Sequence, residues 1–215
     1  MIWSPGRKYL FIHIPKTAGT SMALALEARA MKDDVMLGDT PKALKRRRRA
    51  KDLPARGRLW KHSTLADLSG WIDGPDLDGV FVFTLVRNPW DRMVSYYTWL
   101  QTQGFDHPSV HLAHTSTFAD FVAHPATQAA WRNAPARHYV TDASGVEVCS
   151  AYIRVEHFQQ DAAPLWAHLG FALDLPRENA STRGLDYASY YSDTTKDIVA
   201  EIAAEDIARF DYRFA

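Results

Sequence analysis

The chain has 215 residues, of which 47% are hydrophobic, and its 25 Lys and Arg residues balance its 25 Asp and Glu residues. A chain of this length and composition can bury a substantial core, which excludes general disorder. The formal net charge of zero excludes a global field that would select nucleic acid or a membrane. Because Cys149 is the single cysteine, no intramolecular disulfide can form, and a reducing compartment is permitted.

Residues 1–8 lead directly into an apolar run and lack the pattern of a signal peptide. No apolar stretch is long enough to span a membrane. We therefore expect a cytoplasmic protein with a single domain over residues 1–215.

A strand, a tight loop and a helix are predicted near the N-terminus. The apolar run at residues 9–14 indicates a buried strand that Pro15 ends, and residues 21–30 have a helix-forming composition. The unpaired N–H groups at a helix N-terminus favour an anion. Lys16 adds a full positive charge, and Gly19 lets the backbone approach a ligand. Hydroxyl donors are supplied by Thr17, Thr20 and Ser21.

A nucleoside triphosphate loop is the obvious rival interpretation of this segment. That loop has the pattern G-x-x-x-x-G-K-[ST], with its lysine after the second glycine. Here Lys16 precedes Gly19, and no earlier glycine lies at the required spacing. The order of residues therefore argues against a Walker-type kinase.

A second strand–turn–helix unit is predicted at residues 80–97. The continuous apolar run at 80–86 is typical of a central parallel strand. Asn88 is a good N-cap and Pro89 suits the first helical position. Arg87 then stands at the end of the strand. One face of the helix is predicted to carry Arg92, Ser95, Tyr96 and Trp99.

Together the two segments resemble the cofactor motifs of the sulfotransferases that use 3′-phosphoadenosine 5′-phosphosulfate (PAPS). Residues 15–21 resemble the phosphosulfate-binding loop, and R-N-P-x-x-R-x-x-S-x-Y at 87–97 resembles the 3′-phosphate motif. In that motif the first arginine and the serine hold the phosphate, here Arg87 and Ser95. The resemblance is specific only at these two motifs, although it runs in order from Tyr9 to the C-terminus.

The resemblance implies a bacterial enzyme similar to the Golgi carbohydrate sulfotransferase branch. It implies an α/β fold, a three-layer sandwich with a mainly parallel central sheet that is P-loop-like. PAPS is the implied co-substrate, with no metal. The implied cofactor-binding residues are Lys16, Thr17, Ala18, Gly19, Thr20, Ser21, Arg87 and Ser95, together with Ser181 and Arg183 in a loop that closes over the adenine and 3′-phosphate in the family.

Two residues are predicted to act in the chemistry. Lys16 would stabilise the bridging oxygen as its bond to sulfur breaks. His62 is the candidate base, because an imidazole has a suitable intrinsic pKa and related enzymes carry a histidine between the two motifs. Glu156 and His157 are alternatives for the proton, whereas His13 is expected inside the strand and is worse placed.

A basic segment at about residues 33–58 is predicted to be a solvated, partly helical insertion. Its cations are Lys42, Lys45, Arg46, Arg47, Arg48, Arg49, Lys51, Arg56 and Arg58. Contact of Lys42–Arg58 with an anionic acceptor or an anionic membrane surface is the functional alternative. Nucleic acid is not expected, because aromatic residues are not interleaved with these charges.

The rest of the chain is less informative. The histidines at 107, 111 and 114 could share a helix face, but a metal site is disfavoured because Pro108 weakens a helix there and no acidic or thiol ligand lies among them. Short helices are expected at about 117–123 and 160–169, with extended segments around a turn at 139–148 and a core strand at 152–158. A long helix from Ser192 to about Phe210 would bury Ile198, Ile202 and Ile207.

The expected reaction is sulfuryl transfer from PAPS to a hydroxyl or, as a second choice, an amine, leaving adenosine 3′,5′-bisphosphate (PAP). The acceptor stays open between a small metabolite, a glycan and a lipid head group. Two other classes stay open as well: a P-loop-type nucleotide kinase and a non-catalytic module that binds PAP or a polyanion.

Overall fold

The computed structural model describes residues 1–175 and 186–214, which form two compact units. Unit 1 contains residues 1–86 and 136–175, and unit 2 contains residues 87–135 and 186–214. The two predicted cofactor motifs therefore belong to different units, with Lys16 in unit 1 and Arg87 at the start of unit 2.

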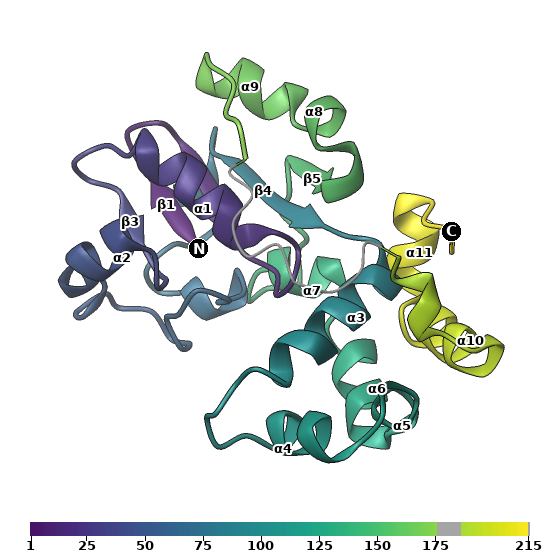
Figure 1. Cartoon of the computed structure of the whole chain (residues 1–215). Coiled ribbons are helices and arrows are strands. Elements are labelled where there is room, and N and C mark those ends of the chain that lie inside the picture. The colour runs from purple at the N-terminus through teal and green to yellow at the C-terminus, as the bar shows by residue number, and fades with distance from the viewer. Residues whose placement is uncertain (176–185, 215) are drawn as a thin grey trace. The chain divides into compact units, whose positions relative to one another are not determined.

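A five-stranded sheet organises unit 1 (Figure 1). Its strand order is β3 (Val35–Met36), β1 (Ile2–Ser4), β2 (Tyr9–Ile12), β4 (Phe81–Val86) and β5 (Ala151–Arg154). Strands β2, β4 and β5 are parallel, whereas β1 is antiparallel to both β2 and β3. This confirms the α/β prediction and its parallel core. The antiparallel edge was not predicted; four residues between β1 and β2 allow only a hairpin connection.

The main core of unit 1 lies on one face of the sheet. There Phe11, Phe83 and Ile153 pack with apolar residues of α1 (Gly19–Ala28), α8 (Phe158–Asp161) and α9 (Ala163–Leu169). Alternate strand residues such as Leu10 and Val82 point to the opposite face and are equally buried. Burial on both faces explains why the β4 sequence is continuously apolar.

The two motif loops leave the same edge of this sheet. Ile12, the last residue of β2, pairs with Thr84 in parallel register, so β4 extends two residues beyond the end of β2 in the same direction. The Thr84 hydroxyl donates to the Ile12 main-chain oxygen at 2.8 Å, which ties the two strand ends together. Ligands of parallel α/β sheets bind at this carboxyl edge.

Short helices complete unit 1. They are α2 (Pro41–Arg46), η1 (Arg47–Ala50), η2 (Ala66–Leu68), η3 (Gly74–Leu77), α7 (Ala136–Val140) and η4 (Val155–His157). Residues 139–148 were predicted as two extended pieces around a turn. Tyr139 and Val140 are instead the last two residues of α7. The turn itself is present, and its Asp142 carboxylate accepts from Ser144 N at 2.8 Å and Val146 N at 2.9 Å.

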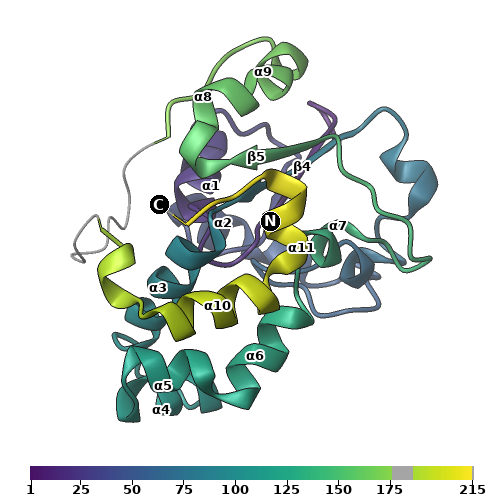
Figure 2. The ribbon, with the colours of Figure 1, turned by 90° about the vertical axis from the view of Figure 1, so that its right-hand side faces the viewer.

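Unit 2 is helical. Its elements are α3 (Pro89–Leu100), α4 (Pro108–Thr115), α5 (Phe118–Ala123), α6 (Pro125–Arg132), η5 (Ala188–Tyr190), α10 (Asp193–Ile202) and α11 (Ala204–Phe210). Figure 2 shows α10 running beside α3 and α6.

The predicted long helix from Ser192 to Phe210 is interrupted. At Ala203 the backbone adopts φ −115° and ψ 19°, which ends α10 before α11 begins. Ile202 and Val199 are buried, whereas Ile198 and Ile207 are only half-buried. The break changes the direction of the apolar face, which a single 3.6-residue period could not anticipate. None of the helices in the described ranges could cross a membrane, because none combines the necessary length and hydrophobicity.

Candidate active site

The loop after β2 has a backbone suited to an anion. Lys16 and Ala18 have positive φ values of 66° and 58°, and Thr17 between them does not. Such alternation turns successive N–H groups toward one point and forms a concave anion-binding nest. The Thr17 hydroxyl donates to the Ile14 main-chain oxygen at 2.9 Å and holds the turn. Two non-glycine residues in a strained conformation are typical of functional loops.

Helix α1 continues this site. It begins at Gly19 with no side-chain cap and with no acidic residue in its first turn. The first N–H groups and the positive end of the helix dipole are therefore left for a ligand. Ser21 is buried, and Thr20 is half-buried beside it. The structure thus brings the predicted residues from Lys16 to Ser21 into one loop and helix start.

Gly19 is required by a neighbouring histidine. A Cβ atom on Gly19 would lie 1.9 Å from His13 Cδ2 and 2.1 Å from His13 Nε2. His13 is 5% exposed, just past the end of β2, and its ring stacks on Phe11 with centroids 5.9 Å apart. Sequence reasoning explained the glycine by ligand approach alone and missed this contact, because nothing in the sequence indicates where the His13 ring points.

His62 lies against His13. Its Nδ1 is 2.8 Å from the His13 main-chain oxygen, and the two rings meet edge-on with centroids 4.5 Å apart. Because a carbonyl oxygen can only accept, Nδ1 carries the proton and Nε2 carries the lone pair. Among the described residues no hydrogen bond involves Nε2. The neutral imidazole is therefore held in the tautomer that a general base needs.

Burial is the main cause that lowers the pKa of His62 to about 4, and the positive charge of Lys61 lowers it further. The hydrogen bond to the His13 main-chain oxygen acts in the opposite direction. The helix that follows, η2, is only one turn long, and Asp67 N within it donates to the Thr64 hydroxyl at 3.2 Å. Desolvation, and not a helix dipole, therefore keeps the imidazole neutral.

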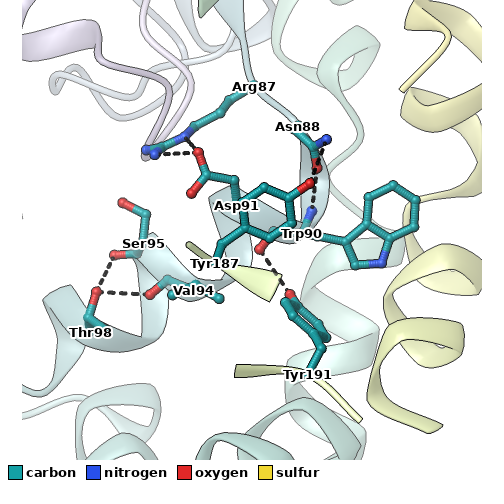
Figure 3. Close-up of polar contacts among 9 residues, drawn as sticks. All are labelled: Arg87, Asn88, Trp90, Asp91, Val94, Ser95, Thr98, Tyr187 and Tyr191. Carbon is teal, nitrogen blue, oxygen red and sulfur yellow. Dashed lines mark hydrogen bonds and ion pairs between the residues drawn. The ribbon is translucent and has the colours of Figure 1, made fainter. Parts of the chain in front are cut away.

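The second motif opens unit 2 (Figure 3). The Arg87 guanidinium binds the Asp91 carboxylate, with Nε–Oδ2 and Nη2–Oδ2 distances of 2.7 and 2.6 Å. Both side chains are 18% exposed, so this pair is well shielded from water. In Figure 3 the hydroxyl of buried Ser95 turns to the same side of α3 as this pair. The Arg87 guanidinium and the Ser95 hydroxyl thus lie on the same side of α3.

The start of α3 is held firmly. The Asn88 side chain accepts from Trp90 N at 3.1 Å as the predicted N-cap. Its Nδ2 donates to the Arg213 main-chain oxygen at 2.9 Å, and the Tyr191 hydroxyl donates to the Trp90 main-chain oxygen at 2.9 Å. These bonds fix the backbone from which Arg87 extends. The sequence indicated the cap but gave no sign of the second bond.

A profile of the sulfotransferase family matches residues 1–213. The chain belongs to the sulfotransferase family. This confirms the prediction of a PAPS-dependent sulfotransferase that the two motifs carried. A search of curated proteins finds no match. Among solved structures, the chain is similar to the crystal structure of mouse sulfotransferase SULT7A1 complexed with PAP, with 15% identity over 95% of this chain and 85% of that chain and a TM-score of 0.49.

Other motif residues of this sulfotransferase have bracing contacts. The Arg92 guanidinium lies 4.8 Å from the centre of the Trp131 ring, and the Tyr97 hydroxyl donates to the Ser116 main-chain oxygen at 2.8 Å. In unit 1, Arg154 binds Asp161 through Nε at 2.7 Å and so connects β5 to α8. That ion pair gives Arg154 a structural role that the sequence did not reveal.

The remaining predicted residues are dispersed or lie outside the described ranges. Ser181 and Arg183 belong to residues 176–185, outside the described part of the chain. His107 caps α4, His111 pairs with Asp106, and His114 contacts the Leu100 main-chain oxygen. No group of three His, Cys, Asp or Glu side chains within residues 1–175 and 186–214 is arranged to hold a metal ion.

Proposed function

We propose that this sulfotransferase moves the sulfuryl group of PAPS to an acceptor hydroxyl, with an amine as the second choice, and releases PAP. The observation that carries the proposal is the strained Lys16–Ala18 loop that opens into the uncapped start of α1. Backbone N–H groups and one lysine meet there without a local carboxylate in the first helical turn. Such an arrangement suits a phosphate that leaves with increased negative charge.

We propose that both motifs bind the sulfuryl donor, PAPS. We assign the 5′-phosphate to the N–H groups and hydroxyls of Thr17, Ala18, Gly19, Thr20 and Ser21, and the 3′-phosphate to Arg87 and Ser95. Ser181 and Arg183 stay assigned to the adenine side by resemblance. Because one family profile covers residues 1–213, both units are treated as one sulfotransferase domain.

The acceptor side is assigned to His62. In the proposed step the acceptor oxygen forms a bond to sulfur while the bond between sulfur and the 5′-phosphate oxygen breaks. His62 Nε2 takes the acceptor proton, and Lys16 stabilises the charge that the leaving oxygen gains. The Nδ1–H bond to His13 supports this assignment, because it leaves Nε2 as the acceptor atom.

PAP is expected to raise the melting temperature far more than AMP does. A ligand that binds only the folded state stabilises it by about 2.7 kcal/mol at a hundred times its dissociation constant. AMP lacks the 3′-phosphate and forfeits the contacts of Arg87 and Ser95. Differential scanning fluorimetry with equal concentrations of PAP, AMP and ATP measures the difference. Equal stabilisation by PAP and AMP would remove the 3′-phosphate site from the proposal.

The Arg87→Ala variant sharpens this comparison. Its affinity for PAP should fall by about 1.5–3 kcal/mol, the value of a charge-assisted hydrogen bond, while its affinity for AMP stays near that of the wild type. Arg132→Ala is the matched control, because Arg132 also pairs with a carboxylate, Glu201, but at an exposed position. That variant should bind both nucleotides normally.

We also propose that the basic segment meets an anionic membrane surface. Lys45, Arg47, Arg48 and Lys51 are exposed and form no ion pair with any described residue. Leu44 beside them is 50% exposed and could enter the interface. Anionic membranes attract such clusters by about 1 kcal/mol per cation.

The proposal also includes the acceptor and the location. The acceptor is a small metabolite, a glycan or a lipid head group, and the enzyme is located in the cytoplasm of a bacterium.

A further inference from the structure

His13 lies between the candidate base, His62, and the donor loop that ends at Gly19. Its main-chain oxygen accepts a hydrogen bond from His62 Nδ1, and its ring fills the space that a Cβ atom on Gly19 would occupy. Gly19 is the first residue of α1, whose N-terminus belongs to the donor loop. One residue therefore contacts the candidate base on one side and the donor loop on the other.

The His13 ring has a defined environment. It is 5% exposed, stacks on Phe11 at an interplanar angle of 18°, and meets the His62 ring edge-on at 64°. Trp60 closes the other side of His62, with ring centroids 5.0 Å apart and an interplanar angle of 85°. His62 is thus held between two rings that leave it little rotational freedom.

Burial and, to a smaller extent, nearby positive charges keep His13 neutral. Burial lowers its pKa well below the usual value, and the N-terminal amine, His62, Lys61 and Lys16 act in the same direction. A neutral, buried imidazole is a poor proton donor to the acceptor. Among the described residues its ring makes no hydrogen bond, so its side chain contributes shape and not proton transfer.

We propose that His13 is a positioning residue that sets the orientation of His62 relative to the donor loop. Its main-chain oxygen selects the tautomer of His62, and its ring acts as a spacer between His62 and Gly19. This inference rests on the proposed role of His62 as the base. A displacement of about 1 Å in a catalytic group can cost about 10²-fold in rate, so a missing spacer should be visible in turnover.

The test is a double-mutant cycle between His13 and Gly19, measured by PAPS turnover and PAP affinity. Gly19→Ala alone should weaken PAP binding, because the new Cβ atom has no room beside His13. In the His13→Ala background that space is open, so the same substitution should cost at least tenfold less in PAP affinity. An equal cost in both backgrounds would overturn the spacer role.

A readout that does not depend on turnover separates this inference from the proposed function. Nitrogen-15 NMR of the His62 ring distinguishes Nδ1–H from Nε2–H. The wild type should show Nδ1–H. In His13→Ala the main-chain oxygen remains, but the ring that packs against His62 is gone, so the His62 ring can turn away from that oxygen and should show a mixture of tautomers with a pKa nearer 6.5. His13→Phe should restore much of the wild-type tautomer and rate. If His13→Ala left the His62 tautomer and pKa unchanged, His13 would not position it. If both changed while turnover did not, the role of His62 as the base would fail instead.

Discussion

Turnover of the Lys16→Ala variant should fall by about 10²–10³-fold, with a smaller loss in PAP affinity. The reason is that the lysine charge is needed most when the bond between sulfur and the leaving oxygen breaks. Removal of one preorganised donor to a developing negative charge costs this much in other enzymes. Steady-state rates with PAPS and calorimetric affinities for PAP give the two numbers, and their ratio is the result of interest.

The backbone at this position makes alanine the correct replacement. Lys16 has φ 66°, a strained value for any residue with a Cβ atom, so alanine keeps the strain unchanged. Glycine would relieve that strain and would change loop geometry and charge together. Lys8 is a matched control, since it is an exposed lysine with φ 50° in the turn between β1 and β2. Lys8→Ala should turn over normally. Equal losses of turnover and PAP affinity in Lys16→Ala would reduce the lysine to a binding residue.

His62→Ala should lower acceptor-dependent turnover by about 10²–10⁴-fold, the usual contribution of general acid–base catalysis. PAP affinity should stay near the wild-type value, because the base acts on the acceptor. His157→Ala tests the rival base, since His157 lies exposed in η4. A full loss of turnover in His157→Ala together with an active His62→Ala would reverse the assignment.

The pH dependence of turnover gives a second test of His62 as the base. A base acts when it is deprotonated, so the rate should hold from pH 7 to about pH 5 and fall as the pH approaches about 4, the pKa of His62. A histidine with an ordinary pKa would lose activity near pH 6.5 instead. This fall in rate at acid pH should be absent from the residual activity of His62→Ala.

Acid also weakens the fold, and the two effects must be separated. The unfolded imidazole of His62 binds its proton near pH 6.5, whereas the folded one does so near pH 4. The unfolded state therefore binds more protons between these values, and the stability that His62 contributes above pH 6.5 is lost as the pH falls through this window. Rates measured within seconds of a pH jump, before unfolding, report the base alone.

The sequence was most informative where local chemistry decides the structure. The two strand–turn–helix units were predictable because Asn88, Pro89 and the apolar run at 80–86 give strong local signals. The order of Lys16 and Gly19 separated a sulfotransferase loop from a triphosphate loop. These features depend on neighbours in the chain, and the helix start at Gly19 and the Asn88 cap lie within two residues of where they were expected.

Contacts between distant residues could not be predicted. The ring of His13 above Gly19 and its oxygen on His62 join residues up to 49 positions apart. The low pKa of His62 could not be predicted either, because it results mainly from burial, and the rings of Trp60 and His13 pack against the imidazole. The break at Ala203 was likewise not predictable, because the helical pattern of the sequence continues through it.

The most direct test of the central claim is transfer of labelled sulfate from PAPS into an extract of the source organism, followed by mass identification of the product. We expect one labelled organic product heavier than its precursor by a single sulfuryl group, formed with one equivalent of PAP and formed about 10²–10³-fold more slowly with Lys16→Ala. Tight PAP binding without transfer to any acceptor would instead identify a binding module. Transfer of phosphate from ATP in the absence of PAPS would contradict the account altogether.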